Sequence, residues 1–177
     1  MNIFAIDEHP VRAARQMVDK HVVKMILEAG QMLSTSHRVL DGEEYYDRTK
    51  NNRRIKRWRL SDEREDKLWK ASFVNHPCTQ WTMESRMNYR WHATHALALC
   101  REYTHRYEKV HNSQGLIEYL FNREPLNIRE GGLTKFAVAM PDQYKVECSV
   151  ESYRNYYRGE KAYFAKWKNR DTPVWWE

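Results

Sequence analysis

The sequence predicts an all-α protein, a single compact helical domain spanning residues 1–177. A chain of 177 residues has the size of one domain. Apolar residues recur at three- and four-residue steps over long stretches, which is the period of an amphipathic helix. The six glycines and five prolines are too few for the many turns of a β-sandwich. No stretch alternates long enough to predict a strand, apart from a short one at residues 136–140.

The first long helix is expected over residues 10–34. Pro10 suits the first position of a helix, and an apolar stripe at helical spacing follows from Val18 to Leu33. A long central helix is expected over residues 77–107, after the break at Asn75-His76-Pro77. Shorter helices are expected over residues 61–73, 113–121 and 150–168.

Composition excludes several classes of protein. No stretch approaches the ~18 consecutive apolar residues of a membrane span, and the N-terminus lacks the basic and then apolar order of a secretory signal. The three cysteines, Cys78, Cys100 and Cys148, are too widely spaced for a disulfide scaffold or a CxxC metal motif. We therefore expect a monomer in a reducing cytoplasm, that of the host if the protein is viral, with no membrane association.

Residues 48–59 are expected to form a basic loop. They contain seven basic residues and no acidic one, in a chain of net charge +6. Such a run binds phosphates well, and Trp58 adds a surface on which a base can stack. The alternative is an exposed, solvated loop. The candidate DNA contacts are Arg53, Arg54, Lys56, Arg57 and Arg59.

The first helix carries a polar stripe beside its apolar one. His21, Lys24 and Glu28 lie at helical spacing, so an imidazole, an amine and a carboxylate converge on one side. A carboxylate at the border of the apolar stripe is a candidate general acid–base group. The alternative is an ordinary solvated helix face. Asp19 falls near the apolar flank, where a carboxylate needs a partner.

Other kinds of catalytic site have little support. His92 and His95 have a spacing that suits a metal, but no further ligand is evident, so we expect neither a metal nor a cofactor. The sequence contains no GxSxG motif and no glycine-rich phosphate loop.

Two motifs carry a resemblance to a known family. Asp19-Lys20-His21, followed after six residues by Glu28, resembles the Asp-x-His-x6-Glu segment of the phage endonuclease V type of pyrimidine-dimer DNA glycosylase. The element from Asn75 to Trp81 is similar to an Asn-His-Pro-x-x-x-Trp segment of bacterial relatives of that group, and both chains end in an aromatic tail.

The resemblance implies an enzyme that holds duplex DNA, flips a nucleotide and excises its base. In that family an N-terminal amine attacks the sugar C1′ and forms a Schiff base. Glu28 would take the role of the carboxylate and His21 that of the active-site imidazole, with Asp19, Asn75 and His76 in support. Trp81 or Trp175 would fill the gap left by the flipped base.

The N-terminus departs from the family pattern. Asn2 is not a small residue, so Met1 is expected to be retained, and the segment before Asp19 is about five residues longer than in the phage enzyme. The amine is therefore that of Met1, or that of Lys24, or there is no lyase chemistry. The expected function is a DNA glycosylase acting on a damaged or modified pyrimidine, with or without AP-lyase activity. The alternatives are a phage base-modifying transferase and a non-catalytic nucleic-acid-binding module.

Overall fold

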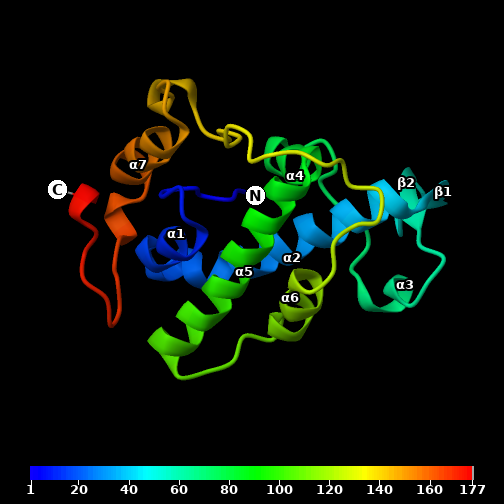
Figure 1. Ribbon diagram of the computed structural model, residues 1–177, viewed down its shortest axis with the longest axis horizontal. Coiled ribbons are helices and arrows are strands. Elements are labelled where there is room, and N and C mark those ends of the chain that lie inside the picture. The colour runs from blue at the N-terminus through cyan, green and yellow to red at the C-terminus, as the bar shows by residue number, and fades with distance from the viewer. Residues whose placement is uncertain (177) are drawn as a thin grey trace.

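The computed structural model describes residues 1–176 and is mostly helical, but it is not all-α. A two-stranded antiparallel sheet stands where a basic loop was expected, which corrects the predicted fold class. The helices are α1 (Pro10–Gln16), α2 (Asp19–Asp41), α3 (Arg64–Lys67), α4 (Pro77–Glu84), α5 (Arg86–Tyr107), α6 (Gln114–Phe121) and α7 (Ser149–Glu160), and the strands are β1 (Glu43–Arg48) and β2 (Arg54–Arg59). Short 3-10 helices lie at Asp142–Tyr144, Ala162–Phe164 and Val174–Trp176 (Figure 1).

The predicted first helix is divided into α1 and α2 by two extended residues, Met17 and Val18. The fully buried Arg106 causes the division, because its guanidinium donates to the carbonyls of Arg15 and Met17 at the end of α1. The same group binds Asp19 Oδ1 at 2.9 Å. Asp19 therefore has the partner that its position in the sequence demanded, and its role is to join α2 to α5.

The hairpin β1–β2 forms from residues with strand preferences within and just before the basic run. Tyr45, Tyr46 and Ile55 suit a pleated surface, on which Tyr45 and Ile55 are half-buried and Tyr46 is exposed. The strands pair in register from Glu43 with Arg59 to Arg48 with Arg54. Asn52 closes the turn with a φ of 58°, a left-handed conformation that asparagine tolerates. The alternation was missed because arginine and lysine occupy most of its exposed positions.

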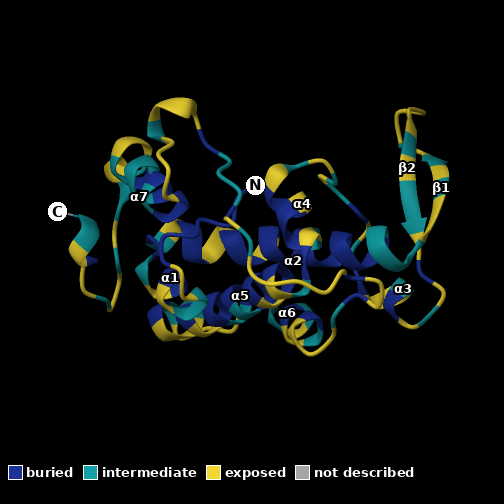
Figure 2. Cartoon of the chain, turned by 45° about the horizontal axis from the view of Figure 1, so that its top comes forward, coloured by how far each residue is buried: buried dark blue, intermediate teal, exposed yellow. Residues whose placement is uncertain are grey.

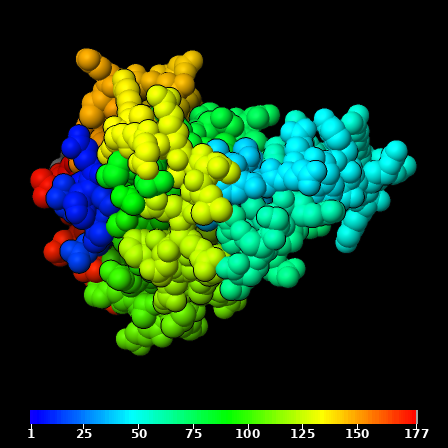
Figure 3. All heavy atoms as spheres, turned by 45° about the vertical axis from the view of Figure 1, so that its right-hand side comes forward, coloured from blue at the N-terminus to red at the C-terminus, as the bar shows by residue number. Residues whose placement is uncertain are grey.

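The base of the hairpin is connected to the end of α2 by the buried Arg38. Arg38 donates to the carbonyls of Trp58, Leu68 and Trp69 and pairs with Glu65 at 2.6 Å. These contacts satisfy the guanidinium in the interior, where an unpaired charge would be costly. The hairpin is thus held as a projection at one end of the molecule (Figure 3).

Several other predicted boundaries move. The central helix is broken at Ser85, whose hydroxyl accepts from the amide of Asn88 and starts α5. The predicted helix 61–73 contains only α3, and α7 ends at Glu160 rather than near residue 168. Residues 136–140 form no strand. The helix predicted at 113–121 is confirmed as α6.

The core lies where α2 and α5 cross, with α1, α4 and α6 packed around them (Figure 1). One cluster of buried apolar residues extends from Ile3 to Tyr157. Figure 2 shows that burial is concentrated on these helices and decreases along the hairpin. No helix in residues 1–176 has the length and apolar character to cross a membrane.

Four buried histidines make stability depend on pH. Burial lowers the pKa of His21, His92 and His95 to about 3 and that of His37 to about 4. Below about pH 6.5 the unfolded chain takes up protons that the folded chain does not. The free energy of unfolding is therefore expected to be undiminished above pH 6.5 and to fall as the pH drops from 6.5 towards 4.

Urea unfolding at a series of pH values measures this dependence. The substitution His95→Phe removes one buried imidazole. It is expected to reduce the slope of the free energy of unfolding against pH, between pH 6.5 and 4, by the equivalent of about one bound proton. His105 is exposed, so His105→Gln is the matched control and is expected to leave the slope unchanged. A pH-independent stability over this range would contradict the burial of neutral imidazoles.

Candidate functional site

The N-terminus of the chain returns to the middle of α2. The Met1 amine lies 3.6 Å from Glu28 Oε2, and the amide of Asn2 donates to the same oxygen at 2.9 Å. Glu28 is 7% exposed. A buried carboxylate thus faces the free amine at the start of the chain, which sequence analysis had left as one of three alternatives.

Asn2 holds the terminus in this position. Its side-chain amide donates to the carbonyl of Ala139 at 2.8 Å, and its Oδ1 accepts from the amide of Phe4 at 3.2 Å. Ala139 belongs to the long connection between α6 and α7, which passes beside the N-terminus (Figure 1). From the sequence, Asn2 matters only because it favours retention of Met1. No local pattern predicts that its side chain anchors the N-terminus.

Lys24 completes a cluster of two amines on one carboxylate. Its Nζ lies 3.2 Å from Glu28 Oε1, one helical turn away, and its side chain is 64% exposed. The Met1 side chain is buried beside this carboxylate, whereas the Lys24 side chain reaches solvent. The cluster therefore offers one amine suited to nucleophilic attack, one cation suited to binding a phosphate, and a carboxylate between them that can exchange protons.

His21 lies on the same side of α2 but is turned into the core. Its Nδ1 is 2.6 Å from the hydroxyl of Tyr157, and its ring stacks on Phe4 at 4.3 Å between centroids. Burial, with Lys161 and Lys24 nearby, lowers the pKa of His21 to about 3. His21 is neutral under ordinary conditions and positions the N-terminal segment through Phe4.

His76 stands at the start of α4, near the amine and the carboxylate. Its Nδ1 accepts from the amide of Cys78 at 3.2 Å, which places the proton of the neutral ring on Nε2. Burial lowers the pKa of His76 and the N-terminal ammonium lowers it further, while Glu28 opposes the shift. The neighbouring Asn75 is exposed and lines a groove beside the hairpin.

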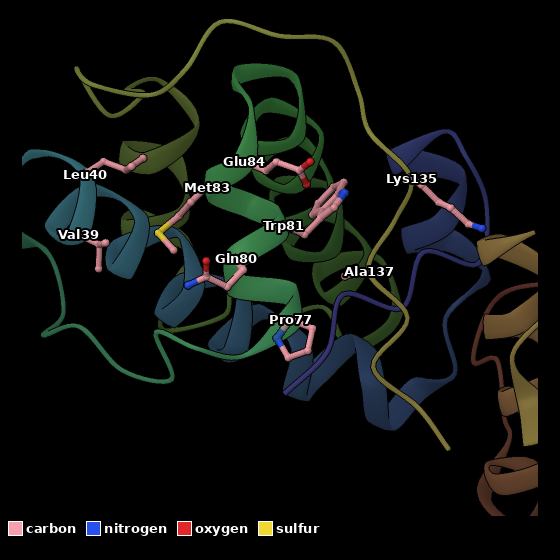
Figure 4. Close-up of a pocket in the computed structure, with 9 residues that line it drawn as sticks. All are labelled: Val39, Leu40, Pro77, Gln80, Trp81, Met83, Glu84, Lys135 and Ala137. Atoms are coloured by element: carbon pink, nitrogen blue, oxygen red, sulfur yellow. The ribbon is translucent and has the colours of Figure 1, made fainter. Parts of the chain in front are cut away.

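The two tryptophans expected to enter DNA are engaged elsewhere. Trp81 is 3% exposed and packs against Trp91 and Phe136. It also lines a pocket of about 630 Å³ between α4, the end of α2 and the connection to α7 (Figure 4). Trp175 is half-buried, and its indole donates to Gln16 Oε1 at 2.7 Å. The burial of Trp81 in the core disagrees with its expected role of filling the gap left by a flipped base. The contacts of Trp175 hold its ring against α1.

The basic residues of β2 and of the turn before it divide into exposed ones and an anchor. Arg53, Arg54, Lys56 and Arg59 are exposed, whereas Arg57 is half-buried and donates to the carbonyl of Ala71 at 3.2 Å. Lys56 is paired with Glu44 at 3.0 Å, and Arg54 lies over the ring of Tyr46 at 3.5 Å. The turn and the tip of the hairpin therefore offer the free positive charge, and Arg57 attaches the hairpin to the body.

If the hairpin contacts the phosphates of duplex DNA, removing charge from its turn is expected to weaken the salt dependence of binding. In Arg53→Ala/Arg54→Ala, the slope of log K against log salt is expected to fall by about 0.9 for each phosphate that the variant no longer neutralises. Gel-shift titrations at several KCl concentrations measure the slope. The control replaces two exposed basic residues of another region, Arg101→Ala/Lys109→Ala. An equal slope in both variants would place the hairpin outside the interface.

The two histidines considered as metal ligands both lie on α5, and their side chains are buried in the core. His92 Nδ1 is 2.8 Å from the hydroxyl of Thr82, while neither ring nitrogen of His95 has a hydrogen-bond partner. Among residues 1–176, no three histidine, cysteine or acidic side chains are grouped as a metal ion would require.

Comparisons of the chain with protein-family models, with curated proteins and with solved structures find no match. The Met1–Glu28–Lys24 cluster and its surroundings are therefore the features that bear on function.

Proposed function

We propose that this protein is a DNA glycosylase of the endonuclease V type, which excises a damaged or modified pyrimidine and then acts as an AP lyase. The observation that carries the proposal is the Met1 amine, 3.6 Å from the buried carboxylate of Glu28. An amine and an acid in contact, one able to attack and the other to exchange protons, are what Schiff-base chemistry at a sugar requires.

In the proposed reaction the Met1 nitrogen attacks C1′ of the sugar, and the bond from C1′ to the base breaks. The base leaves with the electron pair of that bond and takes up a proton. Glu28 accepts a proton from the attacking nitrogen and returns it to O4′ as the sugar ring opens, which gives a Schiff base between Met1 and C1′. Loss of a proton from C2′ then expels the 3′ phosphate, and water hydrolyses the Schiff base.

The surroundings of the cluster suit a duplex. The 23 residues of α2 span about 34 Å, close to one turn of B-DNA. Lys20 lies one turn before Lys24 and is exposed, and the basic hairpin stands at the other end of the helix. Positive charge on both sides of a buried acid can hold the phosphates that flank one nucleotide.

The two alternatives use fewer of these features. A transferase that modifies a flipped base needs the pocket and the charges but not an amine at the carboxylate. A binding module needs only the charges. The contact between Met1 and Glu28 therefore favours the glycosylase.

Borohydride trapping on a duplex with one abasic site tests the proposal. We expect a covalent adduct whose mass spectrum maps the sugar to the Met1 nitrogen. An adduct on Lys24 would assign the lyase to the other amine. Base release is measured in parallel on a duplex that carries a modified pyrimidine. Base release there without an adduct on the abasic duplex would leave a glycosylase without lyase activity, and the absence of both would overturn the proposal.

A further inference from the structure

The segment between α3 and α4 carries an exposed aromatic ring, that of Phe73, three residues before His76. The amide and carbonyl of Ser72 both bind the hydroxyl of Thr35 on α2, at 3.0 and 3.1 Å. Thr35 lies seven residues after Glu28, so it is on the same face of α2 and about 10 Å further along the axis. Phe73 follows Ser72 directly, and three residues later His76 lies near the Met1 amine and Glu28, so this segment runs along α2 towards the cluster.

Phe73 has no place in the core. It is 61% exposed, and among residues 1–176 no aromatic ring stacks on it. Its φ of 50° is in the left-handed region, which is unfavourable for a bulky residue. The carbonyl of Phe73 accepts from the amide of His76 at 2.9 Å, so the turn that presents the ring also begins α4. Strained backbone that exposes an apolar side chain is characteristic of functional positions.

A groove of about 430 Å³ separates this segment from the hairpin. Trp58 and Ile55 provide apolar surface on one wall, and Phe73 and Asn75 lie on the other. Lys56 lines the hairpin wall, where its ammonium is paired with Glu44 at 3.0 Å. The groove combines aromatic faces with a cation, a combination that suits a nucleic-acid strand.

We propose that Phe73 is a positioning residue that enters the base stack near the target nucleotide. This inference rests on the proposed glycosylase function. Apolar side chains inserted at a base step unstack and kink a duplex, and this lowers the cost of extruding a nearby nucleotide. Trp81 and Trp175 are held by other contacts, whereas the ring of Phe73 is free to make the insertion.

Fluorescence of 2-aminopurine placed one, two or three steps from an abasic site tests the insertion. We expect wild-type protein to raise the fluorescence at one of these positions, and Phe73→Ala to raise it at none. Phe73→Trp keeps a ring and is expected to preserve the signal. Phe73→Gly removes the ring without backbone strain and is expected to match Phe73→Ala, which excludes misfolding as the cause. Tyr163→Ala, at a residue that is 86% exposed, is the control for loss of an unrelated aromatic ring.

Rates of borohydride trapping separate this inference from the function on which it rests. Phe73→Ala is expected to trap abasic duplex 10- to 100-fold more slowly than wild type and to trap an abasic single strand, which has no stack to open, at the wild-type rate. Equal rates and equal fluorescence for wild type and Phe73→Ala on the duplex would overturn the role of Phe73 alone. Failure of the wild-type protein to trap either substrate would overturn the glycosylase–lyase function and this inference with it.

Discussion

Acetylation of the Met1 amine is expected to abolish the covalent adduct with abasic DNA. The electron pair of an acetylated nitrogen is delocalised into the carbonyl and cannot attack C1′, and the nitrogen no longer carries the charge that pairs with Glu28. We expect trapping to fall to the level of a reaction without enzyme, a loss of at least three orders of magnitude. Duplex affinity is expected to change little, because the phosphate contacts assigned to Lys20, Lys24 and the hairpin remain.

The control for this experiment is Lys24→Arg, which keeps the positive charge beside Glu28 but is not a nucleophile under these conditions. If Met1 is the attacking amine, Lys24→Arg is expected to trap within a few-fold of wild type. Full trapping by acetylated protein, together with loss of trapping in Lys24→Arg, would assign the reaction to Lys24 instead.

Replacing Glu28 by glutamine is expected to slow base release by two or more orders of magnitude and leave binding intact. Glutamine keeps the volume of the side chain and an oxygen that can accept from the Asn2 amide, but it cannot exchange a proton with the Met1 nitrogen or O4′. Single-turnover excision on DNA with modified pyrimidines, measured beside a gel-shift titration, separates the two effects.

Glu118 is an exposed glutamate on α6, and Glu118→Gln is therefore the matched control, with an expected change of less than two-fold. Retained base release in Glu28→Gln would falsify the assignment of Glu28. Loss of binding together with loss of base release would show instead that Glu28 mainly holds the N-terminal segment in place.

Local patterns predicted the parts of the site that lie on one helix. His21, Lys24 and Glu28 are brought to one side of α2 by the 3.6-residue period, as expected. The same period did not reveal that His21 faces the core, because that depends on Tyr157, 136 residues away. Position along a helix gives the direction of a side chain but not the element that meets it.

The hairpin shows why the fold class was predicted incorrectly. The run from 48 to 59 was interpreted by charge, and its alternation was hidden because arginine and lysine occupy most of the exposed positions of β2. What stabilises the strands is the anchoring of their base by Arg38, together with the bond from Arg57 to Ala71. Those contacts join segments that are 14 or more residues apart, beyond the range of local propensity.

Local patterns predict the apolar and polar stripes of the first long helix, the extent of α6, and the need of Asp19 for a partner. Which groups meet depends on the folded chain: the Met1 amine contacts Glu28, Arg106 contacts Asp19, and Phe73 rather than Trp81 is at the surface. Periodicity follows from the geometry of the backbone and can be recognised within a few turns of chain. A contact such as that between Asn2 and Glu28, 26 residues apart, depends on how whole elements pack, and only the folded chain specifies it.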